Sequence, residues 1–158
     1  MTLEEKQLLI RDLYSRLPYK VNVAFYLYTT HEWFTSTLRS INPTEETYRI
    51  GNQDYDNFTH IKPYLRPMSS MSEDEKEKLK SKCLHTETEE DWEGVRSDSW
   101  GIEILDKYDT ERWDNTIYVS SIINMDAIDW LNAHHFDYRG LIEMGLALEA
   151  PEGMYKTD

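Results

Sequence analysis

The sequence predicts an α+β fold: an N-terminal helix and a small antiparallel sheet, then a proline-rich connector, then an acidic lobe with a β-hairpin and C-terminal helices. Three observations support this prediction. Apolar residues recur at helical spacing near the N-terminus, the following segments alternate with a period of two, and the C-terminal segment combines capping residues with glycine stops. We divide the chain into residues 1–67 and 68–158, and the pattern leaves open whether both parts share one core.

The first helix begins at a capping box. Thr2 and Glu5 supply its two side chains, and apolar residues follow at spacings of three and four until Pro18 ends the helix. Alternating residues then predict strands at 21–28 and 33–41 and a shorter strand around Tyr48 and Ile50. The first lobe is therefore expected to be a helix followed by a small antiparallel sheet.

Residues 61–71 contain two prolines four positions apart. Pro63 and Pro67 push the residues before them toward extended geometry and cannot donate backbone hydrogen bonds. We therefore expect a stiff extended connector that contains the boundary between the lobes.

The second lobe opens with another capping box. Ser72 and Glu75 predict a helix that runs to about Cys83 and contacts the core through Leu79. An acidic loop at 87–93 follows, and alternation at 100–105 and 116–123 predicts a hairpin.

The C-terminal part of the second lobe is expected to be mainly helical. Asn124 or Asp126 can cap a helix whose Trp130 faces the core. Asp137 can cap a shorter helix that stops at Gly145, a brief strand is expected at 146–148, and residues 153–158 are expected to fray.

The charge is uneven along the chain. The net charge is −13; residues 1–67 carry eight basic and eight acidic side chains, whereas residues 68–158 carry nine and twenty-two. Such a field repels nucleic-acid phosphates and anionic lipids and attracts basic protein surfaces. We therefore expect a basic protein partner and neither direct nucleic-acid nor membrane binding.

Cysteine content and hydropathy indicate a cytoplasmic location. Cys83 is the only cysteine, so an internal disulfide is impossible and a reducing compartment is expected. The charged first helix does not resemble a secretory signal, and no apolar run reaches the roughly 20 residues of a membrane helix.

His134, His135 and Asp137 are the candidates for catalysis, because imidazole and carboxylate groups carry protons and bind metals. Adjacent histidines on a helix point about 100° apart, so one site rarely uses both. The alternative is that these histidines lie at a helix end or pack beside Trp130. We predict no resident metal or cofactor, and an enzyme remains the less favoured reading.

Other residues are candidates for binding. Trp92 and Trp113 lie in acidic, irregular sequence, and tryptophan is frequent at binding hot spots. Arg66, with nearby Lys62 and Tyr64, fits either a small anionic ligand between the lobes or pairing with carboxylates of the acidic lobe. The predicted binding residues are Trp92, Trp113, Glu89, Glu90, Asp91 and Arg66.

Two blocks resemble a known family. They are IKPYLRPMSSMSEDEKEKL at residues 61–79 and DWLNAHHFDYRGLIEMGLALEAPEGMY at residues 129–155, and together they cover under a third of the chain. They are similar to short uncharacterised proteins encoded by gut Bacteroidales bacteria and by their phages and mobile elements. The resemblance implies a cytoplasmic, phage-borne protein and assigns no catalytic residue.

These observations favour a non-enzymatic protein-interaction factor. Its acidic, tryptophan-bearing second lobe is expected to bind a basic host or phage protein. The alternatives are a small metal-dependent hydrolase that uses His134 or His135 with Asp137, and a protein that binds a small ligand near Arg66. The sequence does not predict an oligomeric state.

Overall fold

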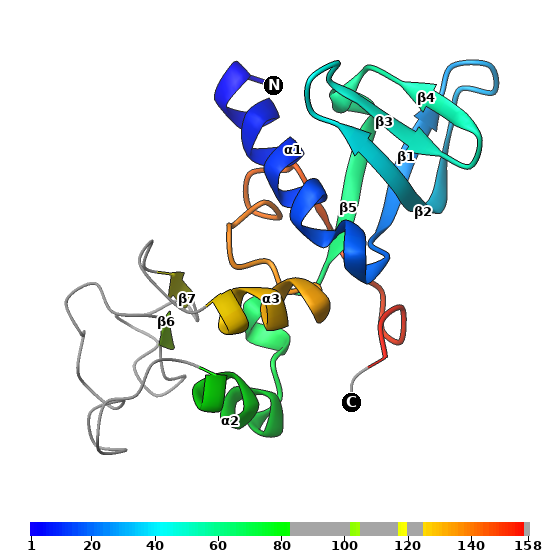
Figure 1. Cartoon of the computed structure of the whole chain (residues 1–158). Helices are drawn as coiled ribbons and strands as arrows, with labels where there is room; N and C mark the ends of the chain where they lie inside the picture. The colour runs from blue at the N-terminus through cyan, green and yellow to red at the C-terminus, as the bar shows by residue number, and fades with distance from the viewer. Residues whose placement is uncertain (83–101, 105–116, 120–124, 157–158) are drawn as a thin grey trace. The chain divides into compact units, whose positions relative to one another are not determined.

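The fold is α+β, as the sequence predicts. The structure is a computed structural model that describes residues 1–82, 102–104, 117–119 and 125–156 (Figure 1). The chain forms two compact units. Unit 1 comprises Met1–Arg66, Asn132–His135 and Arg139–Asp158, and unit 2 comprises Pro67–Leu131 and Phe136–Tyr138.

Helix α1 (Leu3–Arg16) begins at the predicted capping box. The Thr2 hydroxyl accepts a hydrogen bond from the Glu5 backbone N–H at 3.1 Å, and the Glu5 carboxylate accepts one from the Thr2 N–H. These bonds satisfy two of the N–H groups that a helix leaves without intrahelical partners. A short 3-10 helix, η1 (Leu17–Tyr19), follows and contains Pro18, so the predicted end of α1 is confirmed.

Six strands form the sheet of unit 1 in the order β4-β3-β2-β1-β5-β8 (Figure 1). Strands β1 to β5 are joined in antiparallel pairs, whereas β8 pairs with β5 in parallel. The predicted strands at 21–28, 33–41 and around Tyr48 are confirmed as β1, β2 and β3. The strands are β1 (Asn22–Leu27), β2 (Glu32–Asn42), β3 (Thr47–Ile50), β4 (Gln53–Tyr55), β5 (Ile61–Leu65) and β8 (Leu148–Glu149).

Alternation in β1 gives the sheet two different faces. Val23 and Phe25 are buried and pack with Leu9 and Leu13 of α1, so the helix covers this face. Ala24 and Tyr26 lie on the opposite face, where Ala24 is buried and Tyr26 is half-buried. Gly51 makes the two-residue turn between β3 and β4 possible, because its φ of +58° is strained for other residues.

Residues 61–65 form strand β5 rather than part of a connector. Pro63 lies opposite Val23 of β1 in this strand. Proline is tolerated there because β8 pairs only with Tyr64 and Leu65, so β5 has no partner on its other side at Pro63. The extended geometry was predicted, but the strand pairing was not. Two short 3-10 helices flank β5: η2 (Phe58–His60) and η3 (Met68–Ser70).

The C-terminal part of unit 1 differs from the prediction. No helix forms between Asp137 and Gly145; the chain makes consecutive turns there. Leu141, Leu146 and Ala147 are buried with Leu65 of β5 in a small apolar cluster. Burial of these side chains stabilises the turns, because a helix over the same residues could not bring them together on β5.

The described residues of unit 2 include the helix α2, most of the helix α3 and a pair of antiparallel strands. Helix α2 (Glu73–Lys82) begins at the predicted capping box of Ser72 and Glu75. Helix α3 (Met125–Ala133) begins in unit 2, and its last two residues belong to unit 1. Its Trp130 stacks on Phe136 with ring centroids 5.7 Å apart. Leu79 of α2 is fully buried in the same cluster, as predicted. Strands β6 (Ile102–Ile104) and β7 (Ile117–Val119) pair antiparallel, which confirms the hairpin.

Among the described residues, no helix has both the length and the apolar character that a bilayer-spanning segment requires.

Candidate functional site

Several predicted binding residues lie outside the described residues. They are Trp92 and Trp113 together with the acidic Glu89, Glu90 and Asp91. Their role stays a prediction from the sequence.

The histidine pair lies at the end of α3, where the helix gives way to a turn. His134 is half-buried, whereas His135 is only 4% exposed and has a left-handed φ of 59°. His135 stacks on Tyr155, with ring centroids 3.8 Å apart and an angle of 23° between the ring planes. The expected neighbour, Trp130, stacks on Phe136 instead. Asp137 is a buried residue of unit 2.

The surroundings of His135 keep its ring neutral. Burial is the main cause that lowers the pKa of His135 to about 4, and the positive charge of Arg16 adds to this effect. A backbone hydrogen bond with Tyr19 acts in the opposite direction. This pKa lies well below the range near neutral pH that suits a general acid or base.

The Tyr155 hydroxyl ties the C-terminal segment to two strands. It accepts a hydrogen bond from the Asn22 N–H of β1 at 3.0 Å and donates one to the Tyr64 carbonyl of β5 at 2.8 Å. Burial raises the pKa of Tyr155 to about 12, so the hydroxyl keeps its proton. We call His135 and Tyr155 with these two bonds the C-terminal clasp. Tyr155 is therefore anchored, contrary to the fraying expected for residues 153–158, of which 157–158 lie outside the described residues.

His135 makes the stability of unit 1 depend on pH. Its pKa is lower in the folded chain than the usual 6.5, so the unfolded chain binds more protons between pH 4 and 6.5. The stabilisation from the neutral ring is complete above pH 6.5 and decreases as the pH falls toward 4, by about 3 kcal/mol. NMR titration should show the His135 ring still neutral at pH 5.

A matched pair of variants tests this prediction. His135→Asn removes the buried imidazole from a left-handed position that asparagine tolerates. His31→Asn is the control, because it makes the same substitution at an exposed histidine with a φ of 57°. Urea unfolding between pH 4.5 and 7.5 should show a weaker pH dependence for His135→Asn alone. An equal dependence in both variants and the wild type contradicts the assignment to His135.

Arg66 follows β5 and is half-buried in unit 1. Its backbone N–H donates a hydrogen bond to the His135 carbonyl at 2.7 Å, and its charge contributes to the low pKa of His135. On β5, the Tyr64 hydroxyl lies 3.2 Å from the Thr35 hydroxyl of β2, within hydrogen-bond distance. Arg66 is thus next to the C-terminal clasp.

Within the described part of the chain, no group of three or more His, Cys, Asp or Glu side chains is arranged to hold a metal ion.

Within the described part of the chain, a cluster of aromatic rings lies on the face of the sheet opposite α1. Strand register places Tyr26 of β1 beside Trp33 of β2. Tyr28 follows Tyr26 at the end of β1, His31 lies in the turn to β2, and His60 ends η2 just before β5. We call Tyr26, Tyr28, His31, Trp33 and His60 the aromatic face.

Ring contacts connect the whole aromatic face through Tyr26. Its centroid lies 5.6 Å from those of Tyr28 and Trp33 and 5.1 Å from that of His60. Tyr28 meets His60 edge-on at 4.7 Å. These distances are those of favourable aromatic pairs, so each ring restrains its neighbours.

Hydrogen bonds also hold these rings. The Tyr26 hydroxyl lies 3.2 Å from His31 Nδ1, and the Tyr28 hydroxyl accepts a hydrogen bond from the Asn57 side chain at 3.2 Å. Three of the rings nevertheless remain open to solvent: Tyr28 is 59% exposed, Trp33 is 48% exposed and His31 is also exposed. The arrangement is a preorganised apolar surface with polar edges, which can bind apolar, aromatic or cationic groups.

Sequence reasoning placed Tyr26 and Tyr28 on the polar side of a strand and did not recognise them as a site. The available signal was that this side of β1 carries tyrosines, and that a tryptophan begins the next strand. Strand register was required to bring Tyr26 and Trp33 together.

Comparison of the chain with protein-family models, with curated proteins and with solved structures finds no match.

Proposed function

We propose that the protein is a non-enzymatic protein-interaction factor that binds a basic host or phage protein through the aromatic face. The observation that carries the proposal is the joint exposure of Tyr28 and Trp33 within a cluster of ordered rings. Exposed apolar patches with polar rims mark interaction sites, and tyrosine and tryptophan dominate binding hot spots.

The ordered rings favour tight binding. Tyr26 and Trp33 stand on paired strands and Tyr28 is held by Asn57, so little side-chain entropy remains to be lost on association. A flexible loop with the same residues would lose more conformational entropy on association. The aromatic face is therefore suited to a specific partner.

The choice of a basic partner rests on charge. The net charge of −13 accelerates association with a basic protein and opposes binding to nucleic acid. Lysine and arginine side chains also bind favourably over the faces of tyrosine and tryptophan rings. The acidic segment with Glu89, Glu90 and Asp91 is proposed to contribute through this long-range attraction.

The test compares recovery of partners by tagged wild-type protein and by a Tyr28→Ser/Trp33→Ser variant, from a Bacteroidales lysate with and without phage infection. We expect a stoichiometric basic protein that elutes at high salt. The double variant should bind it at least about tenfold more weakly, since hot-spot side chains contribute about 2 kcal/mol or more each. Affinities of the recovered protein are then measured by calorimetry.

Met144→Ser is the matched control, because Met144 is an exposed apolar residue of unit 1 outside the aromatic face. It should leave the affinity unchanged.

Charge reversal of Glu89, Glu90 and Asp91 should slow association and weaken its salt dependence. A partner that binds wild type and double variant equally rules out the aromatic face, and recovery of no salt-sensitive partner rules out the proposed function.

A further inference from the structure

Helix α1 carries a second apolar stripe beside the face that packs on the sheet. The core face presents Leu9 and Leu13, both fully buried. Leu3, Ile10 and Tyr14 lie along the neighbouring side of the helix, with Gln7 between them. The steps from residue 3 to 7, 10 and 14 are four, three and four residues, which is the spacing of a helix–helix contact stripe.

The second stripe is largely uncovered. Leu3 is 66% exposed and Tyr14 is 56% exposed, whereas Ile10 is half-buried and reaches the core. Exposed large apolar side chains are common singly, but a row of them at helical spacing indicates a contact surface.

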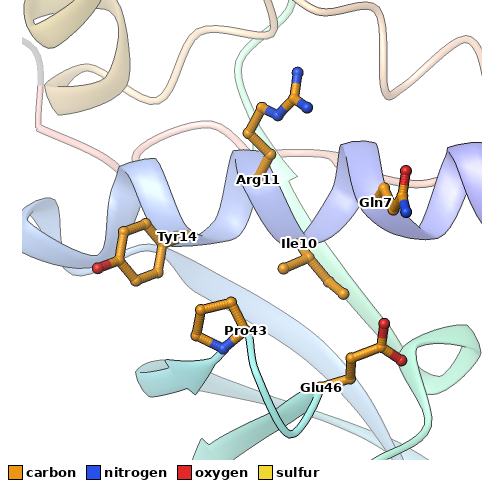
Figure 2. A pocket seen from close by; sticks show the side chains of 6 residues that line it. All are labelled: Gln7, Ile10, Arg11, Tyr14, Pro43 and Glu46. Atoms are coloured by element: carbon orange, nitrogen blue, oxygen red, sulfur yellow. The ribbon is translucent and has the colours of Figure 1, made fainter.

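The stripe borders an open hollow of about 480 Å³. The turn between β2 and β3 forms its other wall, so Pro43 faces Ile10 and Tyr14 across it (Figure 2). This volume falls within the range of about 300–1,000 Å³ that is typical of ligand pockets. The residues that line the hollow are Gln7, Ile10, Arg11, Tyr14, Pro43 and Glu46.

Among the described residues, Arg11 at the rim of the hollow is a positive charge without a counter-ion. Glu46 forms an ion pair with Lys6, so these two charges offset each other. Within the described ranges, the Arg11 guanidinium forms no ion pair or hydrogen bond with another residue, and in Figure 2 it extends from the side of α1 away from Pro43. It therefore flanks the stripe as charged residues flank the apolar seam of paired helices.

We propose that this groove binds an amphipathic helix of a partner protein. The partner helix has apolar residues at spacings of three and four that pack on Leu3, Ile10 and Tyr14. It also has an acidic residue that pairs with Arg11. The inference concerns a different surface from the aromatic face and does not depend on the function proposed above.

A selection experiment tests the groove directly. The full-length protein is used to select from a displayed library of helical peptides of about 20 residues, with apolar residues fixed at the seam and flanking positions randomised. We expect the selected peptides to carry aspartate or glutamate at one flanking position. Tyr14→Ser and Arg11→Glu should each weaken their binding by about tenfold or more.

A charge swap and a control surface make the outcome specific. A lysine at the selected acidic position should restore binding to Arg11→Glu and lose binding to the wild type. Trp33→Ser, on the aromatic face, should bind the peptides as the wild type does. Tyr14 and Arg11 are both exposed, so their variants should have the same melting temperature as the wild-type protein.

Two results overturn the proposal. One is a selection that yields no peptide whose binding depends on Tyr14 and Arg11. The other is concentration-dependent self-association in sedimentation experiments that Tyr14→Ser abolishes, since a second copy of the chain would then occupy the stripe.

Discussion

Replacing Asp12 with asparagine is expected to lower the free energy of unfolding by about 3 kcal/mol or more. The Asp12 carboxylate is fully buried and accepts two hydrogen bonds from Arg16, at 2.8 Å from Nε and 3.0 Å from Nη2. Arg139 Nε lies 3.3 Å from the same carboxylate. A neutral amide removes the negative charge from between two guanidinium groups, and a buried charge that loses its counter-ion is costly.

Urea denaturation measures this loss, and the chain offers a matched control. Asp54 makes a similar two-point contact with Arg49, at 2.7 Å for both bonds, but their side chains are 51% and 45% exposed. Water and salt screen this pair, so Asp54→Asn should leave the denaturation midpoint unchanged. Equal effects of the two substitutions would show that burial of Asp12 is not what makes it important.

Replacing Tyr155 with alanine is expected to have the second largest effect, also about 3 kcal/mol. The substitution removes the ring that stacks on His135 and the hydroxyl that joins β1 to β5. The loss has two causes: a void beside the imidazole, and the loss of a bonding partner for the Asn22 N–H and the Tyr64 carbonyl.

Two further variants separate these causes. Tyr155→Phe keeps the ring and removes only the hydroxyl, so a loss of about 1–2 kcal/mol is expected. Tyr14→Ala removes a tyrosine that is 56% exposed and should change thermal stability little. If Tyr155→Ala melts with the wild-type protein, the C-terminal clasp contributes nothing to the stability of unit 1.

Local patterns predicted most of the helices and strands correctly. Both capping boxes form as expected, because the reciprocal bonds of Thr2 with Glu5 and of Ser72 with Glu75 involve residues only three positions apart. The alternation correctly predicted that Val23 and Phe25 are buried, although Ala24 on the other side of β1 is buried as well. Such features depend on nearby residues and are therefore visible in the sequence.

The candidate site was only partly predictable. The sequence directed attention to His135 as a possible proton carrier, but its burial against Tyr155 depends on a residue twenty positions away. It also directed attention to tryptophans in acidic segments that lie outside the described residues. Trp33 joins the aromatic face only because the register of β1 and β2 places it beside Tyr26.

By itself the sequence determined the α+β class, both ends of α1, the start of α2, the strands β1 to β3 and the strong negative charge. The tertiary structure decided that residues 61–65 are a strand, that residues 141–147 pack in turns on Leu65, and that Tyr155 connects β1 to β5. The physical reason is distance along the chain. Capping and alternation are set by neighbouring residues. Strand pairing and burial depend on the free energies of contacts between distant segments, and no local pattern specifies those contacts.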